Sequence, residues 1–124
     1  MVLVGRPVGP SDVAVSGTQR IESNLDGGLG LSIISCWEVA KKYQLGKLEL
    51  DRPLNEWMPL ALASPGLTLL PLSIDVVMDS TALPGGFRGD PADEIIAATS
   101  RVHQSPLLTA DAKLIEYGHV DTLQ

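Results

Sequence analysis

Residues 29–46 read LGLSIISCWEVAKKYQLG and contain the pattern that decides the fold. Turn-forming residues 26–28 precede the apolar run Leu29–Ile34, which is typical of a short buried strand. Ser35 then stands where an N-cap is expected, and a helix should run from there to Leu45, before a terminating glycine. A strand followed directly by a helix is the repeating unit of a parallel α/β sheet.

The same alternation continues toward both ends of the chain. Short apolar runs predict strands, and stretches with one apolar face at helical spacing predict helices. The β-prone run Met1–Val4 comes first; the later strands are expected at Leu67–Leu72, Pro106–Thr109 and Val120–Leu123, and the helices at Leu54–Ala63, after Ser73, after Asp90-Pro91 and at Ala112–Tyr117. This order predicts an α/β fold with a parallel sheet and helices on both of its faces.

Composition supports one compact domain and argues against several classes of protein. The chain has 124 residues, of which 44% are hydrophobic, so it can form a core of its own. Cys36 is the only cysteine, which fits a reducing cytoplasm. Prolines and a glycine interrupt the apolar stretch 57–72, so we do not expect a membrane span there. The formal charge of −6 and the aromatic content of 4% argue mildly against nucleic acid as a ligand.

Three carboxylates occupy equivalent positions in the predicted pattern. Glu38 lies in the first turn expected after the strand at 29–34, Asp93 lies in the first turn after Asp90-Pro91, and Asp111 directly follows the strand that ends at Thr109. Strand carboxyl ends and helix amino ends share one edge of a parallel sheet, where ligands bind. Clustered carboxylates need a cation, and oxygen ligands suit Mg²⁺ or Mn²⁺. The sequence therefore predicts a divalent-metal site at this edge.

Each acid also has a purely structural interpretation. Ser35 and Glu38 match a capping box, in which the glutamate only satisfies the start of its own helix. Asp90 and Asp111 stand at N-cap positions, and Asp93 would stabilise the positive end of its helix dipole. For one acid alone the structural interpretation is favoured. Three acids in equivalent places shift the balance toward a site.

Basic residues close to these acids are candidates for contacts with phosphate. The only basic cluster in the sequence consists of Lys41, Lys42 and Lys47. It lies one to two helical turns after Glu38. A solvated helix face is the structural alternative for these lysines. Arg88 comes shortly before the Asp-Pro helix start, where its guanidinium could hold a phosphate group.

Several blocks of the sequence resemble the VapC-type toxins of the PIN-domain ribonuclease family. The blocks are SIISCWEV at 32–39, GKLEL at 46–50, LP at 83–84, RGDPADEIIA at 88–97 and LLTAD at 107–111, and the match runs from about residue 21 to the C-terminus. The resemblance implies a three-layer α/β/α sandwich, a Mg²⁺-dependent endoribonuclease, and a cytoplasmic homodimer silenced by a small VapB-like antitoxin. It assigns Glu38, Asp93 and Asp111 to the catalytic, metal-binding acids and places Asp90 and Thr109 next to them.

The first strand departs from the pattern of this family. Family members begin with a central strand that ends in an aspartate, whereas Met1–Val4 ends at Gly5. Either the strand survives with Gly5 in place of the acid, or residues 1–20 of this single domain are divergent or misread. Two functions therefore stay open. One is a toxin that cleaves RNA phosphodiesters with a metal-activated water, using Mg²⁺ or Mn²⁺; the other is a catalytically impaired module that binds an antitoxin without nuclease activity.

Overall fold

The computed structural model describes residues 2–4, 29–87, 89–109 and 111–123. Among these residues the strands form one sheet in the order β3-β2-β1-β4-β5. The strands are β1 (Val2–Val4), β2 (Leu29–Ser32), β3 (Leu67–Leu70), β4 (Leu107–Leu108) and β5 (Thr122–Leu123). Every neighbouring pair is parallel, which confirms the predicted parallel sheet. All of the strands therefore end at the same edge.

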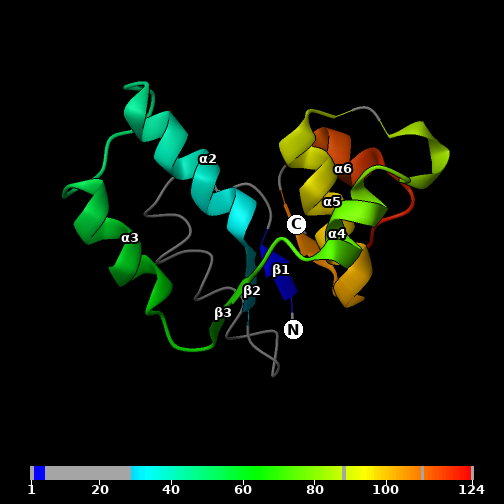
Figure 1. Cartoon of the computed structure of the whole chain (residues 1–124), viewed down its shortest axis with the longest axis horizontal. Coiled ribbons are helices and arrows are strands. Elements are labelled where there is room, and N and C mark those ends of the chain that lie inside the picture. Colours follow the sequence, from blue (N-terminus) through cyan, green and yellow to red (C-terminus); the bar gives the residue numbers. More distant parts are fainter. Residues whose placement is uncertain (1, 5–28, 88, 110, 124) are drawn as a thin grey trace.

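Helices cover the two faces of the sheet. They are α2 (Ile33–Gln44), α3 (Leu54–Leu62), α4 (Ile74–Ser80), α5 (Pro91–His103) and α6 (Ala112–Glu116), with a short 3₁₀ turn, η2, at Pro84–Gly86. Figure 1 shows α2 and α3 on one side of the strands and α4, α5 and α6 on the other. This arrangement confirms the predicted three-layer α/β/α class. Within the described ranges, no helix has the length and apolar character needed to span a bilayer.

The β-prone run near the start of the sequence is the central strand of the sheet. Leu3 of β1 pairs with Gly30 of β2 on one side and with Leu107 of β4 on the other. Of the two interpretations of this segment, the structure therefore supports a surviving first strand. Gly5 and the rest of 5–28, where the departure from the family pattern falls, lie outside the described residues.

Helix α2 begins earlier than the sequence pattern predicts. Ser32 is its N-cap, and the Ser32 Oγ accepts a hydrogen bond from the backbone N–H of Ile34 at 3.2 Å. Ser35, the predicted cap, instead lies buried inside the helix. The predicted strand at 29–34 was therefore too long. Ile33 and Ile34 take helical backbone because Ser32 provides the cap, and from there Ile34 packs against the core.

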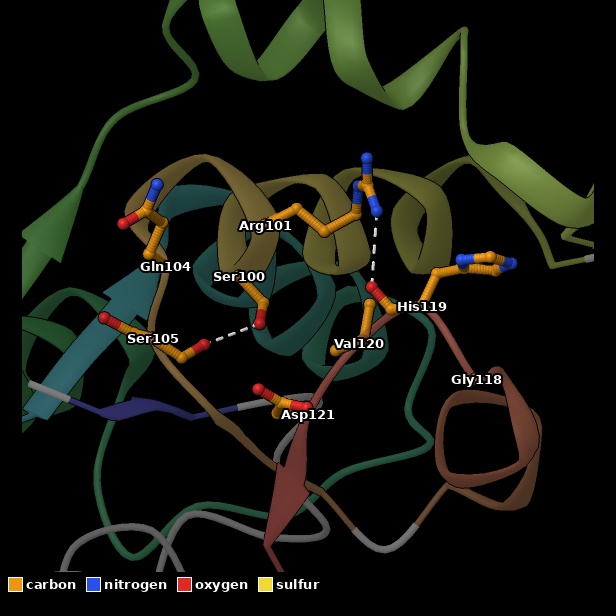
Figure 2. Close-up of a pocket in the computed structure, with 8 residues that line it drawn as sticks. All are labelled: Ser100, Arg101, Gln104, Ser105, Gly118, His119, Val120 and Asp121. Carbon is orange, nitrogen blue, oxygen red and sulfur yellow. Dashed lines mark hydrogen bonds between the residues drawn. The ribbon is translucent and has the colours of Figure 1, made fainter.

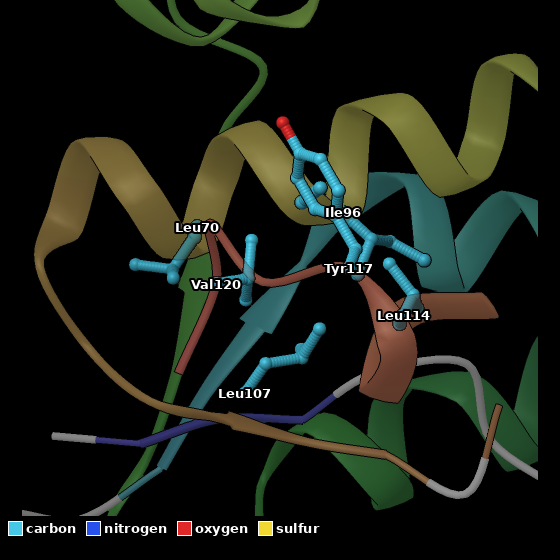
Figure 3. Packing of buried hydrophobic residues seen from close by; sticks show 7 residues of the cluster. Leu70, Ile96, Leu107, Leu114, Tyr117 and Val120 are labelled. Atoms are coloured by element: carbon cyan, nitrogen blue, oxygen red, sulfur yellow. The ribbon is translucent and has the colours of Figure 1, made fainter. Parts of the chain in front are cut away.

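The main apolar core lies where α5 and α6 pack on the sheet (Figure 3). Ile96 and Ala97 of α5, Leu107 of β4 and Leu114 of α6 are all fully buried in this cluster. Leu70, Tyr117 and Val120 complete it. Burying one large aliphatic side chain contributes about 1.5–3 kcal/mol, so these contacts fix α5 firmly against β4.

Candidate functional site

Asp93 is the most deeply buried of the predicted site acids. It lies in the first turn of α5, and its side chain has no exposed surface. Asp90 is the N-cap of this helix, as predicted, and its Oδ1 accepts a hydrogen bond from the backbone N–H of Asp93 at 2.8 Å. Gly89 packs so closely that a Cβ on it would lie 2.7 Å from the Cβ of Asp93. The Gly-Asp-Pro turn therefore holds Asp93 in place.

Asp111 follows β4 at the same edge of the sheet. It is the N-cap of α6, as predicted, and its Oδ1 accepts from the backbone N–H of Lys113 at 2.9 Å. Thr109 is buried, and its Oγ1 accepts from the backbone N–H of Asp111 at 3.1 Å. The backbone N–H of Thr109 also donates to the carbonyl of Leu123, at 3.2 Å. Thr109 therefore orients the turn that carries Asp111.

Lys113, which no sequence motif singled out, lies among these acids. Its Nζ is 3.2 Å from Oδ2 of Asp93. The hydrogen bond to Asp93 and the charge of that carboxylate raise the pKa of Lys113 above its ordinary value, and the charges of Asp111 and Asp90 raise it further. Three of the predicted acids therefore act electrostatically on one position, the ammonium group of Lys113.

Glu38 approaches this region from α2. It lies in the second turn of the helix and is 9% exposed. The first-turn position and the capping box predicted for Glu38 are wrong, because α2 begins at Ile33. Glu38 and Asp90 line one pocket of about 430 Å³, and the remaining walls are the mainly apolar side chains of Ile34, Trp37, Pro91, Ala92 and Ile95. The pocket connects Glu38 with the amino end of α5.

The acids lie in one region without forming a closed metal cage. Across the described ranges, no three His, Cys, Asp or Glu side chains lie close enough together to hold one ion. Mg²⁺ is commonly bound through one or two carboxylates and keeps several water ligands, so a closed cage is not required. The buried carboxylate of Asp93 already attracts a cationic group, and its oxygens are the ligands that Mg²⁺ and Mn²⁺ prefer. The residues present therefore fit a divalent ion at Asp93.

The lysines predicted to contact phosphate lie at the other end of α2. Lys41 and Lys42 are in its last turn, and Lys47 follows the helix. Lys41 Nζ donates a hydrogen bond to Oε1 of Gln44 at 2.8 Å on the exposed surface. In Figure 1 this end of α2 points away from the strands and from α5. The structure thus places these lysines away from Asp93, and the predicted contact of Arg88 lies outside the described residues.

A second pocket lies at the carboxyl end of α5 (Figure 2). It has a volume of about 410 Å³ and is lined mainly by polar residues of 100–105 and 118–121. Arg101 donates from Nε to Oδ2 of Asp79 at 2.8 Å and from Nη1 to the carbonyl of His119 at 3.3 Å. The hydrogen bond to Asp79 raises the pKa of Arg101. This pocket contains none of the predicted site residues, and its polar groups hold α4, α5 and the segment before β5 together.

Comparison with protein families gives a match over most of the chain. The PIN-domain family matches residues 16–120. Ribonuclease VapC22 of Mycobacterium tuberculosis is 29% identical over 110 residues, which cover 89% of this chain and 82% of that protein. The residues matched by the PIN-domain family include Glu38, Asp93 and Asp111.

Comparison with solved structures shows the same fold in toxin–antitoxin complexes. The VapBC2 complex of Rickettsia felis, bound to a DNA fragment from its promoter, contains a chain with a TM-score of 0.71 and 15% identity, covering 99% of this chain and 98% of that one. A toxin-antitoxin complex from Klebsiella pneumoniae gives a TM-score of 0.66 at 18% identity, covering 98% and 97%. At these identities the likeness establishes the fold.

Proposed function

The chain belongs to the PIN-domain family, and we propose that it is the toxin of a VapBC-like toxin–antitoxin pair and a metal-dependent endoribonuclease. The observation that carries the proposal is the position of Asp93. This acid is fully buried, lies at the carboxyl edge of a parallel sheet, and forms an ion pair with Lys113 at 3.2 Å. The similarity to a named ribonuclease and to toxin–antitoxin complexes supports the same assignment.

In the proposed reaction each residue has a separate task. Asp93 would hold the divalent ion together with at most one further carboxylate, that of Asp111 or Glu38, and water molecules would complete its ligands. Asp90 positions Asp93 through the helix cap, and Thr109 positions Asp111 through its backbone N–H. A bound Mg²⁺ or Mn²⁺ lowers the pKa of a water molecule and stabilises charge on a transferring phosphoryl group. The expected product is a cleaved RNA phosphodiester.

The proposed partners follow from the same family assignment. We expect a VapB-like antitoxin to bind the folded domain and silence it, and we expect a homodimer in the cytoplasm. The proteins of similar fold from Rickettsia felis and Klebsiella pneumoniae were solved as toxin–antitoxin complexes, which supports the expected antitoxin. Mg²⁺ is the expected ion, and Mn²⁺ should replace it in binding measurements.

A catalytically impaired antitoxin-binding module is the second candidate function. The observation that favours it is the central position of β1 between β2 and β4. The residue after this strand in the sequence is Gly5, where the family pattern has an aspartate. The loss of one acid would weaken the metal site without removing the fold. Such a protein would bind antitoxin with undiminished affinity and show no metal-dependent cleavage.

The substitution Asp93→Asn tests the proposed function. It replaces a buried carboxylate by a group of the same shape, so the fold should persist. We expect RNA cleavage to fall by at least about 100-fold, because a ligand of the ion and its charge are lost. Cleavage of a fluorescent RNA and calorimetric titration with Mg²⁺ and Mn²⁺ measure the two effects. Asp75→Asn, an exposed acid in the first turn of α4, is the matched control. Unchanged cleavage by Asp93→Asn would rule out the assignment.

A further inference from the structure

Lys113 and Asp93 form an ion pair in the middle of the proposed site. Nζ of Lys113 lies 3.2 Å from Oδ2 of Asp93. The side chain of Asp93 is 0% exposed, whereas that of Lys113 is 53% exposed. A carboxylate removed from water is costly unless a positive charge or hydrogen-bond donors compensate it. The ammonium group therefore supplies compensating charge at the position where the family fold implies a metal ion.

The two partners of this pair differ in how firmly they are held. Asp93 is fixed by the capped first turn of α5 and by the close approach of Gly89. Lys113 reaches it from the short helix α6 with a half-exposed side chain, through a single nitrogen atom. An ammonium on a flexible four-carbon stem is a mobile point charge, and a single contact holds it less firmly than a bidentate guanidinium pair would be held. The carboxylate of Asp93 therefore has a fixed position, whereas the ammonium group of Lys113 can move away and leave its place to another cation.

We propose that Lys113 is an internal counter-ion of the acidic site, whose ammonium occupies the position at Asp93 that a divalent cation takes when it binds. The inference rests on the proposed function in one respect, namely that a divalent cation binds at Asp93. An ammonium and a metal ion cannot both approach Oδ2 of Asp93, because their charges repel and their radii overlap. Binding therefore requires Lys113 to move away from the carboxylate, and Lys113 competes with the metal.

Removing the lysine charge should strengthen metal binding. Lys113→Met keeps the length of the side chain and abolishes the competing charge. We expect this variant to bind Mn²⁺ roughly fivefold more tightly than the unchanged protein, because the metal no longer competes with an ammonium group that has one solvent-exposed side. Lys113→Arg retains the charge and should keep the weaker affinity. Arg52→Met, which removes one positive charge from the exposed pair of Arg52 and Asp51, is the matched control and should leave Mn²⁺ affinity unchanged.

Mn²⁺ titration by electron paramagnetic resonance measures this affinity with the metal as the only ligand. In the same samples, thermal unfolding gives an independent result. Without metal, Lys113→Met should melt at a lower temperature than the unchanged protein, because Asp93 loses its counter-ion. Saturating Mn²⁺ should raise the melting temperature of the variant more than that of the unchanged protein. The difference between the two melting temperatures should then disappear.

A second measurement uses the unchanged protein and does not depend on the folding of a variant. Acetylation by N-acetoxysuccinimide, read by mass spectrometry, reports how accessible each lysine amine is. Saturating Mn²⁺ should increase the acetylation rate of Lys113 several-fold, because Nζ is released from Asp93. The rate at Lys47, an exposed lysine beyond α2, is the internal reference and should stay constant.

The outcomes separate this inference from the proposed function. Tighter Mn²⁺ binding by Lys113→Met together with faster acetylation of Lys113 supports the counter-ion role. Equal or weaker binding by Lys113→Met, with an unchanged acetylation rate, overturns that role and leaves the metal site standing. If neither protein binds Mn²⁺, the proposed metal site and the counter-ion role both fail.

Discussion

Each end of α5 is bound by an ion pair, and the two pairs differ in geometry and in burial. At the carboxyl end, Arg101 contacts Asp79 through two nitrogen atoms, at 2.8 and 3.4 Å, and also donates to the carbonyl of His119. At the amino end, Lys113 reaches Asp93 through one nitrogen atom at 3.2 Å. The side chains of Arg101 and Asp79 are 29% and 24% exposed, so both partners of that pair are equally protected from solvent.

This difference separates a structural ion pair from an exchangeable one. A planar guanidinium that makes two hydrogen bonds to one carboxylate has a fixed geometry, and it joins α4 to α5. A single contact from a half-exposed lysine to a buried acid has no such constraint. Helix α5 is therefore anchored at its carboxyl end, while its amino end is the place where we propose that one cation replaces another. The following variants test whether changes at the carboxyl end of α5 affect mainly stability and changes at its amino end affect mainly ion binding.

The largest expected loss of stability comes from a substitution in the middle of α5, because the core contacts there hold the whole helix on the sheet. Ile96 has no exposed surface and belongs to the main core, so Ile96→Ala should cost about 3 kcal/mol of unfolding free energy. Urea denaturation measures the loss. Ile74→Ala, at a site that is 76% exposed, is the control and should cost less than about 0.5 kcal/mol. Similar losses for both variants would contradict the assignment of the core.

A smaller loss of stability is expected at the carboxyl end. Arg101→Met removes the bonds to Asp79 and His119 and should cost about 1–2 kcal/mol of unfolding free energy. Its Mn²⁺ affinity should match that of the unchanged protein, since the change is remote from Asp93. Arg52→Met removes an exposed pair at 3.5 Å and serves as the control, with a loss below about 0.5 kcal/mol. A large change in Mn²⁺ affinity for Arg101→Met would contradict the proposal that the carboxyl end of α5 acts only in stability.

At the amino end, the two roles of Asp90 can be separated by two substitutions. Asp90→Ala removes the cap of α5 and should cost about 1 kcal/mol of unfolding free energy. Asp90→Ser keeps a capping oxygen but removes the negative charge, so stability should be nearly retained. If Asp90 acts only through the cap, Asp90→Ser should also retain RNA cleavage. Loss of cleavage in a stable Asp90→Ser protein would show instead that its charge contributes to the site.

The smallest expected effect is a difference in pH dependence between the two pairs. The pKa of Lys113 is raised in the folded chain by Asp93, Asp111 and Asp90, so its stabilising contribution is complete below the ordinary value of 10.5 and is lost as pH rises through the raised pKa. Lys113→Arg should stay charged throughout this range. Melting temperatures of the two proteins should agree at pH 8 and diverge above pH 10.5, with the unchanged protein losing more. Parallel curves would show that the Lys113 pair contributes nothing to stability.

The sequence was sufficient to predict the order of the strands and of the α-helices along the chain, because most of these elements have a clear local signal. Asp90 and Asp111 stand at N-cap positions, and both caps are confirmed. The start of α2 could not be predicted, since Ser32 and Ser35 are equally good caps and the two isoleucines between them suit either a strand or a helix. The choice depends on the packing of Ile34, which is a tertiary contact.

The site was predicted in part, for a related reason. Parallel topology alone indicates that acids after different strands reach one edge, and Asp93 and Asp111 each accept a hydrogen bond from Lys113 there, from Nζ and from the backbone N–H respectively. Lys113 was missed because its partner Asp93 lies in a different helix, and their contact depends on how α6 packs beside α5. The only signal in the sequence is a lysine placed two residues after a candidate acid. The roles of Glu38, Asp93 and Asp111 as metal ligands stay predictions.

The central position of β1 has a consequence for biosynthesis. Leu3 pairs with Leu107, so β1 leaves the ribosome well before β4, and these two strands can pair only after β4 has emerged. In the order of the sheet, β1 stands between the β2–β3 pair and the β4–β5 pair. Contacts this distant along the chain slow folding, and unpaired strand edges are prone to aggregation. The nascent chain therefore exposes one side of β1 until β4 has emerged, and a binding partner or chaperone has this interval in which to act.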